Sequence, residues 1–262
     1  MTTTGTFEEL WRFRELFYFL AWRDIKVRYK QTMLGVLWAI LQPLLTMIIF
    51  TLLFGRIAGL PTDGIPRPVF YYSGLLPWLY FATTLTTAGN SMVQNTNLVT
   101  KVYFPRVILP ASVSISGLLD FLVGSTLLVG MIVWYGLSVG PSVLLWPVLI
   151  LPLVLFTLGV ALILAALNVQ YRDVKYAIPF FIQMWMFLTP VIYPSSLIPE
   201  KWRWLLALNP MTGIIEGFRY AIVPSDGFAL STVLVSLGIS ILVFGVGYVW
   251  FRRTERAFAD IV

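Results

Sequence analysis

Residues 31–55 read QTMLGVLWAILQPLLTMIIFTLLFG and contain no charged side chain. A helix of about 20 apolar residues is long enough to cross the hydrocarbon core of a bilayer. The stretch lies between Lys30 and Arg56 and can supply one such helix. It predicts that the chain is a membrane protein.

The composition of the 262 residues favours the same class. Hydrophobic residues make up 58% and charged residues 11%, whereas soluble domains average about 45–50% and about 25%. This balance excludes a soluble enzyme, a disordered protein and a nucleic-acid-binding module. The chain has no Cys and no His, which argues against disulfides, thiolate chemistry and a His-based metal site.

Other charge-poor stretches predict further spans. We expect an all-α membrane protein with one domain over residues 1–262 and six transmembrane helices, at about 33–55, 69–92, 110–135, 143–167, 177–193 and 228–251. The segment 205–223, within the outer region 195–224, is apolar but contains two charges and three helix breakers, which make it a poor span: Glu216, Arg219, Pro210, Gly213 and Gly217. It predicts a re-entrant helical hairpin at the outer face between spans five and six, covered by protein or water.

Charge decides the orientation of these spans. If the N-terminus is cytoplasmic, five of the 18 Lys and Arg residues lie outside, which leaves 13 inside. The outer five are Arg56, Arg67, Lys201, Arg203 and Arg219. The bias follows the positive-inside rule and predicts that both termini are cytoplasmic. A seventh span at 205–223 would weaken it.

Residues 7–22 predict an amphipathic helix in the cytoplasmic interface. Leu10, Phe13, Phe17 and Leu20 recur at helical spacing, and Glu8, Arg12 and Glu15 share the other side. A functional helix and a simple interfacial anchor are both compatible with this pattern.

Two observations bear on the energy source. No G-x-x-x-x-G-K-[ST] phosphate loop is present, so ATP binding of the Walker type is not expected in this chain. Asp120 is the one acidic residue expected at mid-membrane depth, whereas ion-coupled transporters usually carry several such groups. Any transport energy should therefore come from elsewhere. Asp120 fits a structural role, protonated or satisfied by Ser or Thr on a neighbouring helix, better than a gating role.

Two cytoplasmic segments are candidate sites. The first is the basic cluster that precedes the first span: Arg23, Lys26, Arg28 and Lys30. It would attract phosphate head groups, although such clusters can also serve only to set the orientation of the protein in the membrane. In segment 95–106, Val102, Tyr103 and Phe104 are expected to face the cytosol between Lys101 and Arg106. Apolar side chains in that setting suggest docking of a partner.

Aromatic residues are dense in the second span, the fifth span and the outer segment. Such residues usually form interfacial belts or pack helices together. Their faces also stack on sugar rings, so a pore lined by them could guide a glycan. Both interpretations stay open at this point.

Five motifs, in order, resemble those of type 2 ABC-transporter permeases that export O-antigen, capsule and teichoic acid polysaccharides. They are WRDIKVRYKQT at 22–32 followed by Leu34, Gly35 and Trp38, KVYFPR at 101–106, YRDV at 171–174, TPVIYP at 189–194 and LNPM at 208–211. The resemblance runs from about residue 7 to residue 224.

The resemblance implies a fold and an assembly. It implies six spans with an interfacial N-terminal helix, and a homodimer around a continuous channel in the bacterial cytoplasmic (inner) membrane. Two copies of a separate ATPase subunit would lie below and would bind ATP and Mg; this chain itself would bind no cofactor and do no covalent chemistry. The substrate would be a polymer on a lipid pyrophosphate or phosphatidylglycerol carrier.

The resemblance also implies roles for individual residues. Segment 95–106 would be the coupling helix that the ATPase receives, with contacts from Asn97, Lys101, Val102, Tyr103, Phe104, Pro105 and Arg106. The basic cluster would receive the carrier head group. The glycan channel would be lined by Tyr72, Trp78, Phe181, Trp185 and Tyr193. The outer gate would contain Trp202, Trp204, Asn209 and Pro210.

Three alternatives remain. A drug or small-lipid exporter of the same superfamily would usually carry a longer outer domain than the short loop at 56–67. An integral-membrane enzyme acting on lipid-linked sugars would need paired carboxylates, for which Asp63 with Asp226 and Glu200 with Glu216 are the outer candidates. An ATP-independent channel or scaffold would lack a docking loop.

Overall fold

The computed structural model describes residues 8, 11–30, 35–171, 173–224, 230–255 and 258. Several residues used in the sequence predictions lie outside the described residues, among them Leu10, Gln31, Thr32, Leu34, Arg172 and Asp226. The predicted starts of the interface helix and of the first and last spans, at residues 7, 33 and 228, also lie outside them.

The described residues form helices joined by turns, without strands. In chain order the elements are α2 (Arg14–Lys30), α3 (Gly35–Phe50), the π-helical continuation η1 (Thr51–Ile57), α4 (Arg67–Gln94), α5 (Thr96–Lys101), α6 (Ile108–Trp134), η2 (Pro141–Leu144), α7 (Leu145–Gln170), α8 (Val174–Leu188), η3 (Ser195–Leu197), α9 (Glu200–Ala207), α10 (Pro210–Ile222) and α11 (Leu230–Thr254).

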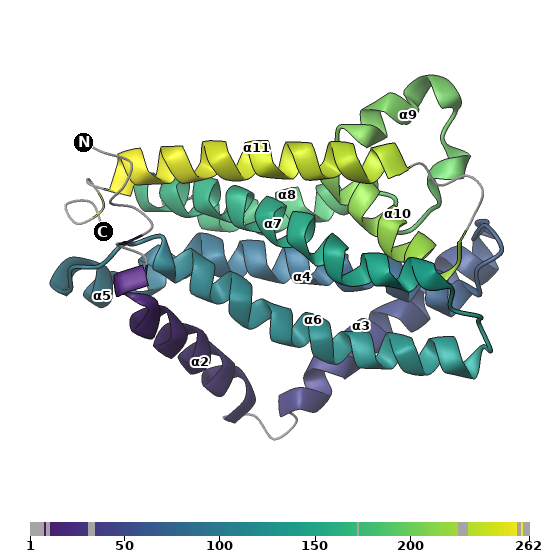
Figure 1. Ribbon diagram of the computed structural model, residues 1–262, viewed down its shortest axis with the longest axis horizontal. Helices are drawn as coiled ribbons and strands as arrows, with labels where there is room; N and C mark the ends of the chain where they lie inside the picture. The colour runs from purple at the N-terminus through teal and green to yellow at the C-terminus, as the bar shows by residue number, and fades with distance from the viewer. Residues whose placement is uncertain are drawn as a thin grey trace.

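The long helices α4, α6, α7 and α11 run roughly along the long axis of the molecule (Figure 1), with α7 packed against α11 and α4, and α4 against α6. The C-terminal end of α11 lies near α5 at one end, and α9 lies at the opposite end (Figure 1). The predicted topology requires this separation, because it assigns these two ends to opposite faces of the membrane.

Four helical stretches among the described residues are long and apolar enough to cross a bilayer: Leu37–Ile57, Ile108–Trp134, Pro141–Gln170 and Leu230–Thr254. They coincide with four of the six predicted spans. α4 has 28 residues but lower hydropathy, and α8 has only 15 residues. The all-helical membrane class is therefore confirmed, whereas the count of six spans stays a prediction.

α4 has a physical reason for its lower hydropathy. Its side chains are buried along most of its length, including Ser73, Thr84 and Ser91, because α3, α6, α7, α8 and α10 all pack on it. A helix surrounded by protein needs fewer apolar residues than one facing lipid, and polar side chains can bond locally inside it. Ser73 and Ser91 do so, donating to the carbonyl oxygens of Phe70 and Ala88.

The N-terminal helix differs from the prediction in length and in its two faces. α2 continues to Lys30, so the basic cluster is helical. Phe13, Phe17 and Leu20 pack on a protein core instead of facing lipid. The face predicted to be polar also exposes the aromatic Phe19. The predicted separation into an apolar lipid face and a polar face is therefore incomplete.

The outer segment folds as two helices that differ in burial. α9 is exposed along most of its length, whereas α10 is buried between α4, α7 and α11. Asn209 caps α10 by accepting a hydrogen bond from the backbone N–H of Met211, and Pro210 occupies the first turn, where a missing N–H costs nothing. The outer segment is thus helical, and the predicted re-entrant hairpin stays a prediction.

Candidate functional site

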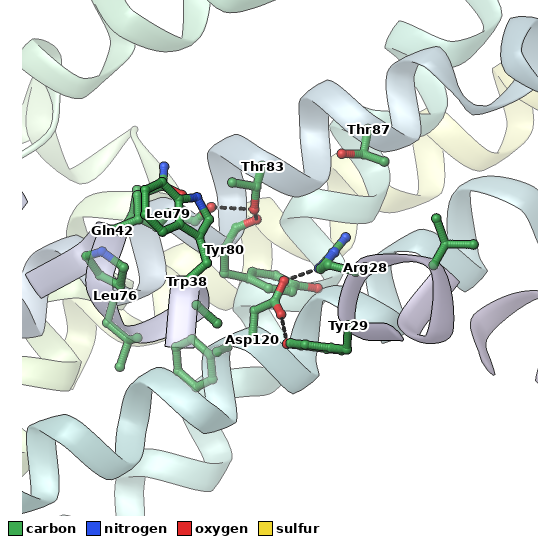
Figure 2. Close-up of a pocket in the computed structure, with 14 residues that line it drawn as sticks. Arg28, Tyr29, Trp38, Gln42, Leu76, Leu79, Tyr80, Thr83, Thr87 and Asp120 are labelled. Carbon is green, nitrogen blue, oxygen red and sulfur yellow. Dashed lines mark hydrogen bonds and ion pairs between the residues drawn. The ribbon is translucent and has the colours of Figure 1, made fainter. Parts of the chain in front are cut away.

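A cavity of about 860 Å³ lies between α2, α3, α4 and α6. Most of its wall is apolar, with Trp38, Pro43, Leu76, Leu79 and Phe121 among the lining residues. Polar side chains line the remainder, and Figure 2 shows how they lie. A large apolar cavity with a few converging polar groups is the usual form of a ligand site.

The centre of the cavity is a carboxylate held by two residues of α2. Arg28 donates to Oδ2 of Asp120, and the Tyr29 hydroxyl donates to Oδ1 (Figure 2). Burial, together with the hydrogen bond to Asp120, raises the pKa of the Tyr29 hydroxyl, which therefore stays protonated and can donate at neutral pH. The prediction that a Ser or Thr side chain would bond Asp120 was wrong, because its two partners come from α2.

The far wall of the cavity carries hydroxyl groups of α4. The Tyr80 hydroxyl lies 2.8 Å from Ser114 Oγ, and Thr83 donates to the Leu79 carbonyl oxygen over 2.7 Å. These bonds satisfy the hydroxyls within the protein. The strongest polar feature left for a ligand is the charged pair of Arg28 and Asp120, each with about a third of its side chain exposed.

Of the four residues of the basic cluster, Arg28 alone lines this cavity. Arg23 bonds Asp24 at 2.9 Å and the side-chain oxygen of Asn95 at 3.1 Å. Lys26 lies over the Trp22 ring at 5.6 Å. Arg23, Lys26 and Lys30 are spaced three and four residues apart and share one side of α2, whereas Arg28 faces the cavity. The prediction of one joint head-group site formed by all four cations therefore needs correction, because Arg28 points away from the other three.

The segment predicted to couple to an ATPase is helical only over Thr96–Lys101. Asn97 and Lys101 are exposed, and Val102 and Tyr103 have 49% and 85% of their surface exposed. Phe104 is buried in the core that includes Leu20 and Phe251, so its predicted exposure was wrong.

The last two residues of this segment also face the protein. Pro105 is buried, and Arg106 donates a hydrogen bond to the backbone oxygen of Glu255 at the end of α11. The end of α4, the start of α6 and the end of α11 are therefore joined at one end of the molecule.

Two of the five aromatic residues predicted to line a glycan channel are buried inside the chain, and a third is half-buried. Tyr72 is fully buried and donates to the Gly124 carbonyl oxygen over 2.9 Å, and Trp78 is also buried. Trp185 packs edge-on against Phe81 and Phe156. A channel surface formed by Tyr72 and Trp78 is not compatible with their burial. Trp185 is only half-buried, and its place in a channel stays a prediction.

The other two aromatic candidates are more accessible. Phe181 has 63% of its surface exposed on α8. Tyr193 is half-buried, and its hydroxyl donates to the carbonyl oxygen of Phe187. Phe181 is thus the predicted channel residue that a neighbouring molecule could reach most easily.

The residues predicted for an outer gate divide into two kinds. Trp202 and Trp204 are exposed on α9. Asn209 links the start of α10 to the end of α8. Its side chain caps α10, accepts from Trp185 Nε1 at 3.3 Å and donates to Thr189 Oγ1 at 2.8 Å. Pro210 is buried at the start of α10.

The sequence did not identify Tyr29 or the pairing of α2 with α6. One signal was present: a lone carboxylate within a span requires a partner, and a cation is the strongest available. Nothing in the spacing indicates which of the many Lys and Arg residues fills that role. Among the described residues, no cluster of three His, Cys, Asp or Glu could hold a metal ion.

Comparisons with known proteins give a consistent set of matches. The family model described as ABC-2 type transporter matches residues 15–223. The chain is 36% identical to the O-antigen export system permease protein RfbA of Myxococcus xanthus over 214 residues, which are 80% of this chain and 81% of that protein. It is 31% identical to RfbA of Klebsiella pneumoniae over 92% of both chains. The polysialic acid transport protein KpsM of Escherichia coli is 26% identical over 90% of this chain and 92% of that protein.

Proposed function

The chain belongs to the ABC-2 type transporter family, and from that membership we propose that it is the channel-forming permease subunit of an exporter of lipid-linked polysaccharide. The observation that carries the proposal is the similarity to two permeases named for O-antigen export, along 80% and 92% of this chain. A homodimer in the cytoplasmic membrane, with both termini inside, would form the channel. Two separate ATPase subunits would bind ATP and Mg.

The cavity between α2, α3, α4 and α6 supports a role in recognising the carrier lipid. Its apolar wall suits an acyl or polyisoprenyl chain, and Arg28 supplies a cation for a phosphate. A guanidinium binds the oxygens of a phosphate in the same two-pronged geometry in which it binds the oxygens of a carboxylate. A phosphate could therefore replace Asp120 as the partner of Arg28, which would loosen α2 from α6.

Val102 and Tyr103 support the proposed coupling to an ATPase. They are exposed side chains at the end of the molecule where α5 and the C-terminal end of α11 both lie (Figure 1). Exposed aromatic residues are typical anchors of protein interfaces. Arg106, three residues after Tyr103, connects this segment to the residue that follows α11, because it donates a hydrogen bond to the Glu255 backbone oxygen.

The test of the head-group role uses polymer export in cells that lack the native gene. Arg28→Gln should leave lipid-linked polymer on the cytoplasmic side, whereas the control Arg14→Gln, on the exposed start of the same helix, should export normally. The double variant Arg28→Gln with Asp120→Asn separates two roles. If Arg28 only neutralises Asp120, the double variant regains export; if Arg28 binds the phosphate, export stays low.

The transport proposal itself is tested with vesicles. Purified permease with its ATPase should move lipid-linked polymer only when ATP is supplied. Movement of polymer by the permease alone, without ATPase and nucleotide, would contradict the proposal and favour an ATP-independent channel.

A further inference from the structure

The surface of α4 changes character along the helix. Residues 69–78 are all buried, whereas the half of α4 that ends at α5 leaves one face uncovered. The polar residues of that face, here called the polar stripe, are Thr83, Thr86, Thr87, Asn90 and Gln94. They are spaced three and four residues apart, as neighbours on one helix face are, and extend over roughly 16 Å. Val93 is the one large apolar residue exposed on α4.

α11 shows the opposite distribution. It buries the hydroxyls of Ser236 and Ser240 and exposes Leu234, Leu242 and Val246. This is the arrangement expected of a span that faces lipid, because a polar group in hydrocarbon loses its hydrogen bonds to water. The exposed face of α4 is therefore not suited to lipid, although α4 is as long as the other spans.

A polar residue of α3 lies beside the stripe. Gln42 is exposed in the candidate span Leu37–Ile57, and it lines the large cavity together with Thr83 and Thr87 (Figure 2). An exposed amide within a span needs water or a polar partner. The sides of α3 and α4 that meet at this cavity thus face a polar environment.

The polar stripe continues from the cavity that contains Arg28 towards the α5 end of the molecule. Thr83 and Thr87 line the cavity with Arg28, and Gln94 is the last residue of α4. The side chains of Thr83, Thr86 and Asn90 bond carbonyl oxygens of their own helix. The Thr87 hydroxyl and the Gln94 amide have no bond to a described residue, and neither is fully buried. These two groups are available to a ligand.

We propose that the polar stripe binds the sugars next to the phosphate of the lipid-linked polymer. The inference rests on the proposed function, which places that phosphate at Arg28. The first sugars are joined to the phosphate, so they must lie beside the cavity, where Thr83 and Thr87 begin the stripe. Hydroxyl and amide groups both donate and accept hydrogen bonds, as sugar hydroxyls require. Each such bond replaces a bond to water and is weak, which allows the polymer to move on.

The absence of Cys from the sequence allows the environment of the stripe to be tested with single cysteines. Thr83→Cys places a thiol on the stripe, and Leu242→Cys places one on the exposed apolar face of α11, about equally far from the end of its helix. The complete transporter in nanodiscs is treated with a charged methanethiosulfonate, which reacts in water and not in hydrocarbon. Residue 83 should react and residue 242 should not. An unreactive thiol at residue 83 would mean that lipid or a second copy of the chain covers the stripe, and would overturn the inference.

A cysteine at the far end of the stripe tests whether sugars bind there. Gln94→Cys lies outside the cavity wall, so a lipid in the cavity does not cover it. Lipid-linked polymer extracted from producing cells, at about ten times its dissociation constant, should slow labelling at residue 94 about tenfold, because the site is then mostly occupied. A polyisoprenyl pyrophosphate without sugars should leave labelling unchanged. Equal effects of the two lipids, or no protection by the polymer, would contradict a sugar site.

A pair of valine variants tests the polar contact. Thr87→Val keeps the shape of the side chain and removes the hydroxyl. It should raise the polymer concentration that half protects residue 94 about tenfold, the loss expected for one hydrogen bond. Thr126→Val is the control, because that threonine is exposed on α6 and its hydroxyl bonds the Val123 carbonyl oxygen. The inference is wrong if both variants bind polymer alike.

ATP-driven transport of the same polymer is measured in parallel for the unaltered protein and for the Gln94→Cys variant. Transport without protection of residue 94 would remove the sugar site and leave the proposed function standing. Absence of transport by the unaltered protein with its ATPase would instead count against the proposed function.

Discussion

Arg28 of α2 is paired with Asp120, which lies 92 residues later near the middle of α6. Tyr29 donates to the other oxygen of the same carboxylate. The two bonds fasten a helix that precedes the first candidate span to the interior of the bundle. They also form the polar centre of the largest cavity described here.

Asp120→Asn should lower the stability of the folded protein by about 1–2 kcal/mol, because it leaves the Arg28 cation without its counter-charge. The loss should be smaller than the about 3–5 kcal/mol typical of fully buried pairs, since solvent reaches about a third of both side chains. The measurement is thermal unfolding in detergent. Glu15→Gln, on an exposed position of the same helix, is the control and should change little. Adding Arg28→Gln to Asp120→Asn should recover part of the loss; an additive loss would show that the two residues do not interact.

Within residues 102–104, the two exposed side chains and the buried one should respond differently to substitution. Val102→Ser with Tyr103→Ala should leave folding intact, because both side chains are exposed, and should abolish stimulation of the partner ATPase. Phe104→Ala should instead destabilise the protein by about 3–5 kcal/mol, because it empties part of a core. ATPase activity of the complex and thermal unfolding of the permease are measured for both. Normal ATPase stimulation in the Val102/Tyr103 variant would contradict the docking role.

The spans were predictable where the helix faces lipid. A lipid-facing helix must be apolar throughout, so a long charge-free stretch marks it clearly, as for 110–135 against Ile108–Trp134. α4 was also found, through its lack of charge, although it is buried in protein and its hydropathy is lower. The outer segment was identified by Pro210, Glu216 and Arg219, which no lipid-facing helix would tolerate together.

The candidate site was less predictable, because the residue type alone does not tell a side chain that packs in the core from one that lines a cavity or channel. Trp185 and Phe181 lie four residues apart and look alike in the sequence, yet Trp185 is half-buried against two aromatic rings and Phe181 is exposed. The partner of Asp120 depends on how α2 docks, which no local pattern encodes. Phe104 was judged exposed from its polar neighbours, whereas the turn after α5 directs it into a core.

Trp185→Ala and Phe181→Ala should therefore separate structure from transport. The Trp185 variant loses packing against Phe81 and Phe156 and the hydrogen bond to Asn209, and should be destabilised by about 3–5 kcal/mol. The Phe181 variant should unfold at nearly the wild-type temperature, because that ring is mostly exposed. If Phe181 contacts the glycan, its variant should export long polymers more slowly than short ones. Equal export of all lengths would remove Phe181 from the channel.

Close contact between α7 and α11 depends on two glycines. A Cβ atom at Gly159 would lie 2.7 Å from the backbone nitrogen of Phe244, and a Cβ at Gly247 would meet the carbonyl oxygen of Gly159. Small residues allow helices in membranes to approach to backbone contact, and a backbone cannot move aside as a flexible side chain can. Gly159→Ala and Gly247→Ala should each force the helices apart and cost about 1–3 kcal/mol.

Gly245 supplies the matched control for these variants, because it lies on the same helix as Gly247 and has open space where a Cβ would be. Gly245→Ala should keep or slightly raise stability, since alanine is the better helix former by about 1 kcal/mol. Retention of the monodisperse elution peak after heating in detergent measures all three variants. Equal heat resistance of the Gly159, Gly247 and Gly245 variants would mean that α7 and α11 are not in backbone contact, and it would remove the rigid connection by which a push on the α5 end could reach the rest of the bundle.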